Sequence, residues 1–183
     1  MYLTGGQYKG RKIEVPNNVK PTLSKVRESI FNMLQSFEFS DKSFLDMCSG
    51  SGIMGLEAIS RGYIVTSLEI NPKVALIIKK TYESIGIKPN LIITDCLKYK
   101  TDKKFEIIYL DPPWGNDYEQ YILKADELLE NKGILIIEFD KENPVEIENI
   151  IKNNKLALNI VKSKKYGRCL ICLLQKILQL NKT

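Results

Sequence analysis

Residues 43–60 have the sequence SFLDMCSGSGIMGLEAIS and decide the fold. The short apolar run 43–47 predicts a strand, and the apolar run 53–60 predicts a helix. Between them lies a glycine turn, in which residues 50–55 match the spacing GxGxxG. A strand, a glycine turn and a helix in this order are typical of sites where the backbone approaches a nucleoside cofactor.

Acidic residues end the strands that we expect around this turn. Glu69 closes the run 63–70, about 20 residues after the glycines, where an acid accepts hydrogen bonds from ribose hydroxyls. Asp46 precedes the glycines and can attract a ligand's ammonium group through the loop. Asp95 ends the strand 91–94, although it could instead cap a turn or helix. The glycines alone fit NAD and S-adenosylmethionine equally, but an acidic rim repels a pyrophosphate and therefore favours S-adenosylmethionine.

Alternating strands and helices predict a doubly wound α/β sheet. The expected strands are 43–47, 63–70, 91–94, 105–110, 133–139, 156–161 and 168–176. The expected helices are 22–37, 53–60, 71–84, 118–130 and 144–152. No helix separates the last two strands, so we expect a hairpin that inserts the final strand antiparallel. The predicted order of the seven strands is 3-2-1-4-5-7-6, whereas a plain dinucleotide-binding fold would end on parallel strands.

Length and composition are typical of a single soluble globular domain of 183 residues. The N-terminus has no apolar signal sequence, and no apolar run approaches the roughly 20 residues of a membrane span. We therefore expect a cytoplasmic protein without membrane attachment. The chain has no histidine, which removes Ser-His-Asp and Cys-His catalysis and the commonest metal ligand.

The four cysteines do not predict a metal site. Cys169 and Cys172 have the spacing of half a zinc knuckle, but they lie in an expected strand, where residues three apart point to opposite faces. No second pair completes four ligands. We expect Cys48, Cys96 and this pair to be reduced thiols.

Basic side chains gather in two regions. The net charge is 27 − 22 = +5, and residues 1–22 are expected to form a small basic hairpin or arm. Such patches favour nucleic acid through phosphate contacts, and the alternative is a solubilising surface. The predicted contacts are Lys9, Arg11, Lys12, Lys20 and Arg27, of which Arg27 lies on an outward face of its helix. A second basic run contains Lys162, Lys164, Lys165 and Arg168.

Asp111-Pro112-Pro113-Trp114 follows the expected buried strand 105–110. It therefore lies at the carboxyl end of a strand, where open α/β sheets bind ligands. The prolines withdraw two N–H donors, Asp111 adds acceptor oxygens and Trp114 adds a stacking face. This combination suits a planar ring with an exocyclic amino group, and the alternative is a strand-ending turn. In the expected strand order the motif faces the bound cofactor.

Together these motifs resemble the class I amino-methyltransferases, whose (Asp/Asn)-Pro-Pro-(aromatic) signature holds a target amino group. Further tracts resemble the RsmD family of bacterial small-subunit rRNA guanine-N2 methyltransferases, over nearly the whole chain. These tracts are residues 5–12 (GGQYKGRK), 20–22 (KPT), 26–34 (VRESIFNML), 45–52 (LDMCSGSG), 55–62 (GLEAISRG) and 165–167 (KYG). The chain departs from the family pattern at three places. Lys20 stands where the family usually has Arg, and Tyr2-Leu3-Thr4 stands where it usually has Arg-Ile-Ile. Before the glycines this chain has Met47-Cys48-Ser49, where the family usually has Phe-Ala.

The resemblance implies a class I methyltransferase domain over 23–183, with a Rossmann-like seven-stranded sheet, preceded by a basic arm over 1–22. It implies S-adenosyl-L-methionine as methyl donor and S-adenosyl-L-homocysteine as product, and we expect no metal and a monomer. The expected donor-binding residues are Asp46, Cys48, Ser49, Gly50, Ser51, Gly52, Glu69, Ile70, Asn71, Asp95 and Cys96.

The implied acceptor is a guanine N2 amine in 16S rRNA, either naked or in an assembling ribosomal particle. The expected catalytic residues are Asp111, Pro112, Pro113 and Trp114. Asp111 and the Pro112 carbonyl accept hydrogen bonds from the amine, while Trp114 stacks on the base. The motif alone does not distinguish guanine N2 from adenine N6, or RNA from DNA. An NAD-dependent oxidoreductase is disfavoured by the lack of histidine and of an evident hydride-site acid or base.

Overall fold

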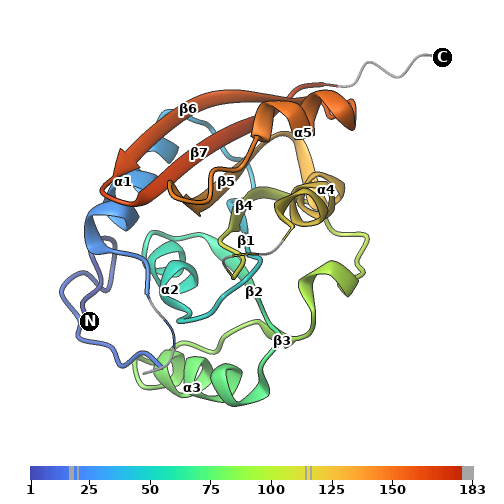
Figure 1. Ribbon diagram of the computed structural model, residues 1–183. Helices are drawn as coiled ribbons and strands as arrows, with labels where there is room; N and C mark the ends of the chain where they lie inside the picture. Colours follow the sequence, from blue (N-terminus) through green and yellow to red (C-terminus); the bar gives the residue numbers. More distant parts are fainter. Residues whose placement is uncertain (17–18, 20, 114, 116, 179–183) are drawn as a thin grey trace. The chain divides into compact units, whose positions relative to one another are not determined.

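The structure is a computed structural model that describes the whole chain except residues 17–18, 20, 114, 116 and 179–183 (Figure 1). The chain divides into two compact units, Met1–Lys100 and Thr101–Thr183. The seven strands have the order β3-β2-β1-β4-β5-β7-β6, so the predicted sheet order is confirmed.

The first unit holds three parallel strands and the helices that accompany them. The strands are β1 (Ser43–Asp46), β2 (Ile64–Glu69) and β3 (Leu91–Ile93). The helices are α1 (Ser24–Leu34), α2 (Ile53–Ser60), α3 (Pro72–Glu83) and the 3-10 turn η1 (Cys96–Lys98). Because β1 pairs with β2 and β2 with β3 in parallel, their carboxyl ends meet at one edge, as predicted for a ligand site.

Helix α2 is the internal helix of the first unit. Seven of its eight residues are buried, which agrees with its apolar sequence and follows from its position after the glycine turn. By contrast, α3 has a polar start: Pro72 occupies its first turn, and the Asn71 side chain accepts a hydrogen bond from the Lys73 N–H at 3.0 Å. The start of α3 is therefore fixed by the Asn-Pro dipeptide.

The second unit holds the remaining four strands. They are β4 (Phe105–Leu110), β5 (Leu129–Asp140), β6 (Leu158–Tyr166) and β7 (Cys169–Lys176). The helices are α4 (Tyr118–Leu128) and α5 (Ile147–Asn153). Strand β5 is parallel to β4, while β7 is antiparallel to both β5 and β6. Figure 1 shows β6 and β7 as the long red hairpin, and the predicted antiparallel insertion of the last strand is confirmed.

Two strands run longer than the sequence pattern predicts. Strand β5 begins at Leu129 instead of residue 133, because the predicted stop is an irregularity within the β4–β5 pairing. Lys132 there has a φ of 64°. Strand β6 continues to Tyr166, beyond its predicted end at 161, because it pairs with β7 up to Tyr166 and Cys169. In both cases, pairing with the neighbouring strand extends the strand through polar residues that the sequence pattern excludes from it.

The N-terminal segment forms a turn-rich arm with a single bridge. Tyr2 pairs with Lys12 in an antiparallel bridge, and the Ile13 N–H donates to the Met1 carbonyl at 2.8 Å. The expected strand over residues 7–15 is not formed, because these residues contain turns and only the bridge residue Lys12.

Three general features complete the fold. All four cysteines, each of them within the described residues, are thiols. The same residues contain no group of three or more His, Cys, Asp or Glu side chains that could hold a metal. Among the described helices, none has the length and apolar character needed to cross a membrane.

Candidate active site

The turn between β1 and α2 requires glycine at two positions. Gly50 and Gly52 have φ values of 50° and 72°, in the left-handed region that side chains disfavour. A Cβ on Gly52 would lie 2.8 Å from Cγ2 of Ile78. The Ser49 N–H donates to the Leu68 carbonyl at 2.9 Å, which ties the turn to β2. The predicted donor residues of this turn are buried or half-buried: Asp46, Cys48, Ser49, Gly50, Ser51 and Gly52.

The third glycine of the motif is a packing position. A Cβ on Gly55 would lie 2.4 Å from the Tyr82 hydroxyl oxygen and 3.3 Å from Asp46 Oδ2. The Tyr82 hydroxyl donates to the Gly52 carbonyl at 2.9 Å. Glycine at 55 therefore lets α2 lie close to both β1 and α3, which fixes the glycine turn against the sheet.

Asp46 is a fully buried carboxyl group with an unsatisfied oxygen. Its Oδ2 accepts a hydrogen bond from the Gly55 N–H at 3.2 Å, but Oδ1 has no partner among the described residues. Burial raises the pKa of Asp46 to about 7, and the charge of Glu69 adds to this, while the Gly55 N–H and Ser49 oppose it. A cation near the turn would favour the ionised form. The orphaned oxygen thus fits the predicted attraction of an ammonium group through the loop.

Glu69 fastens the glycine turn to the end of β2. Its Oε2 accepts the Gly50 N–H at 2.9 Å, and its Oε1 accepts the Asn71 N–H at 2.8 Å. Each carboxylate oxygen keeps a further acceptor site, so ribose hydroxyls remain possible partners. Glu69 therefore combines the predicted position at a strand end with a structural role that the sequence did not reveal.

The two residues after Glu69 differ in character. The side chain of Ile70 is 66% exposed, which offers an uncovered apolar surface at the carboxyl end of β2. The Asn71 side-chain oxygen caps α3 by accepting the Lys73 N–H. Ile70 is thus suited to cover an apolar ligand surface, whereas Asn71 is largely engaged with its own helix.

Asp95 and Cys96 follow β3 and complete this edge of the first unit. Asp95 Oδ1 accepts the Leu97 N–H at 3.0 Å and caps η1, while its predicted contact with the donor stays a prediction. The Cys96 sulfur lies 3.6 Å from the Cys48 sulfur. The ends of β1, β2 and β3 are therefore connected by side chains of the predicted donor-binding set.

A separate groove of about 860 Å³ lies beside α3 and β3. Its walls include Pro72, Leu76, Lys79, Leu91 and Ile93. None of the predicted donor-binding residues lines this groove, so it is distinct from the predicted donor site.

The proline motif begins where the buried strand β4 ends. All six residues of β4 are buried; Asp111 is half-buried, Pro112 is buried and Pro113 is exposed. Trp114 lies outside the described residues. The connection ends at Asp117, which caps α4 by accepting the Glu119 N–H at 3.0 Å. Asp111, Pro112 and Pro113 therefore follow the carboxyl end of β4 directly, as the sequence predicts.

Glu138 on β5 is a polar residue beside this region that sequence reasoning missed. Its Oε2 accepts a hydrogen bond from the Tyr109 hydroxyl at 2.6 Å, and its Oε1 accepts one from the Cys169 sulfur at 3.3 Å. The three residues join β4, β5 and β7 near the end of β4 that carries the proline motif. The one signal in the sequence is a lone acid near the end of an apolar strand.

The predicted cations of the arm divide into two groups. Lys9, Arg11 and Lys12 are exposed, and the Arg11 guanidinium carbon lies 5.7 Å from the centre of the Tyr8 ring. Lys20 lies outside the described residues. The predicted outward position of Arg27 is wrong: its side chain is fully buried, because it forms an ion pair inside the unit.

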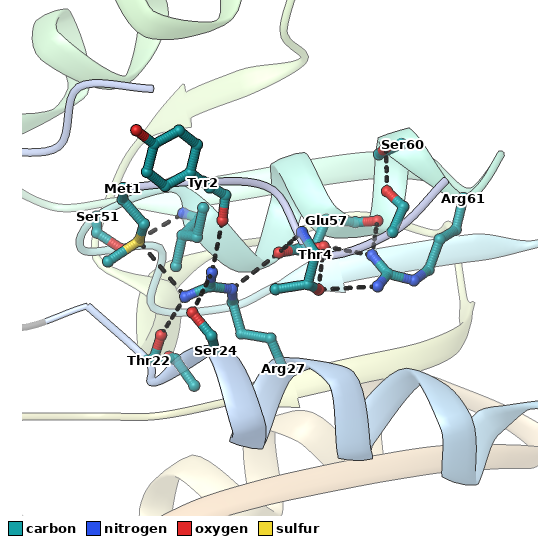
Figure 2. A network of polar contacts seen from close by, with 12 residues as sticks. Met1, Tyr2, Thr4, Thr22, Ser24, Arg27, Ser51, Glu57, Ser60 and Arg61 are labelled. Carbon is teal, nitrogen blue, oxygen red and sulfur yellow. Dashed lines mark hydrogen bonds and ion pairs between the residues drawn. The ribbon is translucent and has the colours of Figure 1, made fainter. Parts of the chain in front are cut away.

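The buried partner of Arg27 is Glu57 on α2, and Figure 2 shows the network around them. Arg27 Nε lies 2.8 Å from Glu57 Oε1, and its Nη2 donates to the Tyr2 carbonyl at 2.8 Å. Thr4 donates to both carboxylate oxygens, through its N–H at 2.8 Å and its hydroxyl at 2.9 Å. Arg61 also pairs with Glu57. This network anchors the arm to α1 and α2.

A second basic surface lies on β6. Its lysines are Lys162, Lys164 and Lys165, all exposed. The sequence shows this basic run, but the strand predicted from the sequence ends at residue 161, before its first lysine. In the structure the run belongs to a strand that is exposed from Asn159 to Lys165, so the three cations are displayed along one element.

Known proteins with similar sequences identify the family. A model of the family described as "Conserved hypothetical protein 95" matches residues 1–175. Ribosomal RNA small subunit methyltransferase D of Buchnera aphidicola subsp. Acyrthosiphon pisum is 37% identical over 139 residues, which is 72% of this chain and 71% of that protein. The protein of the same name from Buchnera aphidicola subsp. Baizongia pistaciae is 30% identical, covering 89% and 87% of the two chains. The chain belongs to the RsmD family.

Solved structures agree with this RsmD assignment. The putative methyltransferase yhhF from Escherichia coli has a TM-score of 0.78 at 26% identity, covering 98% of this chain and 99% of that one. The putative methylase HI0767 from Haemophilus influenzae has a TM-score of 0.75 at 28% identity, covering 97% and 98%. The resemblance inferred from the sequence motifs and the seven-stranded Rossmann-like fold are both confirmed.

Proposed function

We propose that this RsmD-family chain transfers a methyl group from S-adenosylmethionine to the exocyclic N2 amine of a guanine in small-subunit rRNA. The observation that carries this proposal is the match, over 72–89% of the chain, to proteins named ribosomal RNA small subunit methyltransferase D. The choice of guanine N2 comes from the family. An rRNA substrate also supports a cytoplasmic location, and we expect a monomer.

The first unit supplies the residues suited to hold the donor. When bound, S-adenosylmethionine supplies a methyl group on a positively charged sulfur. The glycine turn offers close backbone approach, and Glu69 offers acceptor oxygens for ribose hydroxyls. The buried carboxyl of Asp46, with its orphaned oxygen, favours positive charge near the turn.

The proline motif supplies the residues suited to hold the acceptor. A guanine amine is a poor nucleophile, because its lone pair is delocalised into the ring. Asp111 and the Pro112 carbonyl would accept hydrogen bonds from the two N2 hydrogens, which orients the nitrogen lone pair and favours the positive charge that develops on the nitrogen. Trp114 would stack on the base, a contact worth about 1–3 kcal/mol in other systems.

The acceptor base has to be exposed before transfer. Chemistry on an exocyclic amine requires a base that is unstacked or already located in an RNA loop. Positioning of this base supplies much of the rate acceleration. The motif offers no nucleophile, so the mechanism contains no covalent intermediate with the chain.

The exposed cations of the arm and of β6 are the proposed contacts to RNA phosphates. Lys9, Arg11 and Lys12 are exposed on an arm that the Glu57 network holds in place. An arm fixed in this way loses little conformational freedom when it binds RNA, which favours affinity. The lysines of β6 are displayed on a hairpin strand in the same manner.

The test is methyl transfer with tritium-labelled S-adenosylmethionine to three acceptors: small-subunit particles lacking this modification, naked 16S rRNA and duplex DNA. After nucleoside digestion, we expect label in N2-methylguanosine from one of the rRNA acceptors. Label in N6-methyladenosine, or label only in DNA, would contradict the proposed acceptor. Mapping the labelled nucleotide then identifies the site, and the two rRNA acceptors distinguish naked RNA from an assembling particle.

A further inference from the structure

Two thiols meet at the predicted donor-binding edge of the first unit. Cys48 lies in the glycine turn after β1, and Cys96 begins η1 after β3. Their sulfur atoms are 3.6 Å apart although the residues are 48 positions apart in the sequence. A disulfide has a sulfur–sulfur distance of about 2.05 Å, so the two sulfurs have to approach by roughly 1.5 Å, which side-chain rotation with a small loop movement can supply.

The surroundings favour reaction at this pair. Cys48 is half-buried, so small oxidants have access from its side, while Cys96 is 7% exposed. The pKa of Cys96 is lowered, chiefly by its hydrogen bond with Cys48, against the opposing effects of burial and of Asp95. By comparison, burial and then Glu148 raise the pKa of Cys172 to about 11. The thiolate is the reactive form, so Cys96 is more reactive than Cys172.

We propose that Cys48 and Cys96 form a reversible disulfide in the presence of a peroxide, and that this bond blocks the donor-binding edge. The second part rests on the proposed function. The bond would fix the glycine turn to the start of η1. The same turn has to present its backbone to the donor, and the Gly50 N–H already donates a hydrogen bond to Glu69. A turn fixed at both Cys48 and Gly50 cannot adjust to the donor.

The reaction balances with hydrogen peroxide as the oxidant. One thiolate attacks a peroxide oxygen, the O–O bond breaks, and the sulfur becomes a sulfenic acid while the other oxygen takes up a proton and leaves as water. The second thiol then attacks the sulfenic sulfur. The S–S bond forms, the S–O bond breaks and a second water leaves. The two thiols together lose two electrons and two hydrogens, and a dithiol reductant such as dithiothreitol reverses the step.

The first measurement follows the bond itself. The intact chain is treated with hydrogen peroxide, digested without reductant and analysed by mass spectrometry. We expect a cross-linked peptide pair that contains Cys48 and Cys96, a loss of two hydrogens from the intact mass, and recovery of both thiols with dithiothreitol. Oxidised protein that keeps both thiols, or that joins either of them to a different cysteine, would overturn the proposal.

The second measurement follows the consequence for the donor site. Binding of S-adenosylhomocysteine is measured by calorimetry before oxidation, after oxidation and after reduction, and we expect a reversible loss of affinity of roughly tenfold or more. Unchanged affinity in protein with a confirmed disulfide would overturn the blocking role. Lack of binding by the fully reduced protein would instead contradict the proposed function, so the two failures are distinguishable.

Two variants separate this pair from the other cysteines. For Cys48→Ser, the affinity for S-adenosylhomocysteine is measured before and after peroxide. The two values should be equal, whatever the affinity of the untreated variant is. The matched control, Cys169→Ser with Cys172→Ala, should keep the full reversible loss. If the control variant kept its affinity after peroxide treatment, the loss of affinity would depend on Cys169 and Cys172 instead, and the proposal would be overturned. Circular dichroism of both variants checks that they are folded.

Discussion

Helix α2 contacts two fully buried carboxyl groups, Glu57 in the helix itself and Asp46 at the end of β1, and the two are satisfied differently. Near the C-terminal end, Glu57 receives hydrogen bonds from Arg27, Arg61 and two groups of Thr4. Near the N-terminal end, Asp46 receives the Gly55 N–H, and its second oxygen has no partner among the described residues. The protein therefore supplies hydrogen-bond donors to both oxygens of Glu57, but to only one oxygen of Asp46 among the described residues.

This difference separates architecture from a binding role. A buried charge with a full set of donors stabilises the arrangement around it and gains nothing from a ligand. A buried carboxyl with an orphaned oxygen and a raised pKa is poorly stabilised until a cation comes near. The same helix therefore fixes the N-terminal arm at one end and supports the glycine turn at the other.

The largest expected effect comes from breaking the saturated end. Glu57→Gln leaves the buried Arg27 guanidinium without its counter-charge, and removing one partner of a buried ion pair costs about 3–5 kcal/mol. We expect a loss of that size in the free energy of unfolding, measured by urea denaturation.

The matched control for Glu57 is an exposed helical pair. Lys79 and Glu83 lie 3.8 Å apart on α3, with both side chains more than half exposed. Glu83→Gln should change the free energy of unfolding by less than about 0.5 kcal/mol. If the two variants proved equally stable, the anchoring role of Glu57 would be wrong.

The second effect concerns Asp111, a carboxyl group that is half-buried rather than buried. It extends the comparison to a group kept accessible for the substrate. By analogy with the loss of one transition-state hydrogen bond, Asp111→Ala should lower the turnover number by roughly 10²-fold. Single-turnover methyl transfer to rRNA measures this.

Asp117→Ala is the control in the same strand-to-helix connection. Asp117 caps α4, so its loss should cost about 1 kcal/mol of stability and leave turnover within a few-fold of the parent. Wild-type turnover in Asp111→Ala would remove Asp111 from the mechanism.

The course of the chain through the sheet was predictable because its signals are local. Apolar runs of strand length alternate with helical periods, and the Asn71-Pro72 dipeptide marks the start of α3. The glycine turn, Glu69 and the proline motif were also located correctly at strand ends, because each directly follows or closes an apolar run in the sequence. The strand bounds of β5 and β6 were predicted less well, because pairing with a neighbouring strand carries polar residues such as Lys162 and Lys164 into the sheet.

Contacts between distant residues were not predictable from one sequence. Arg27 has the same local signature as an exposed helical cation, and its burial is explained by Glu57, 30 residues away, together with the Tyr2 carbonyl at the start of the chain. The contact of Cys48 with Cys96 likewise joins strands that have β2 between them in the sheet order. Asp95 caps η1 in the structure, and its predicted contact with the donor stays a prediction.

The third prediction tests the unsaturated end of α2 through pH. The pKa of Asp46 is about 7 in the folded chain and near 3.8 when exposed. The folded state therefore holds a proton that the unfolded state releases, and this carboxyl group destabilises the fold increasingly as the pH rises from about 4 to 7. Asp46→Asn removes that effect, so its stability relative to the parent should be higher at pH 8 than at pH 5, by roughly 2–3 kcal/mol.

The same variant reports on donor binding. Between pH 8 and pH 6 the ionised fraction of Asp46 falls by about tenfold, given its pKa of about 7. The parent should lose affinity for S-adenosylmethionine over this range relative to Asp46→Asn, which corrects for titration of the ligand itself. Parallel pH profiles for the two proteins would show that Asp46 does not favour the donor's charge.

The smallest expected effect separates the displayed cations of the arm from the buried Arg27. Replacing both Arg11 and Lys12 by Gln removes two exposed charges and should weaken rRNA binding by roughly three- to tenfold. It should also reduce the slope of log affinity against log salt by roughly 1.5 to 2, because each lost phosphate contact contributes about 0.7–0.9. Lys79→Gln with Lys80→Gln removes the same charge from α3 and should leave the slope unchanged. Equal slopes for the two double variants would mean that the arm acts only through net charge, and that the Glu57 network positions no RNA-binding surface.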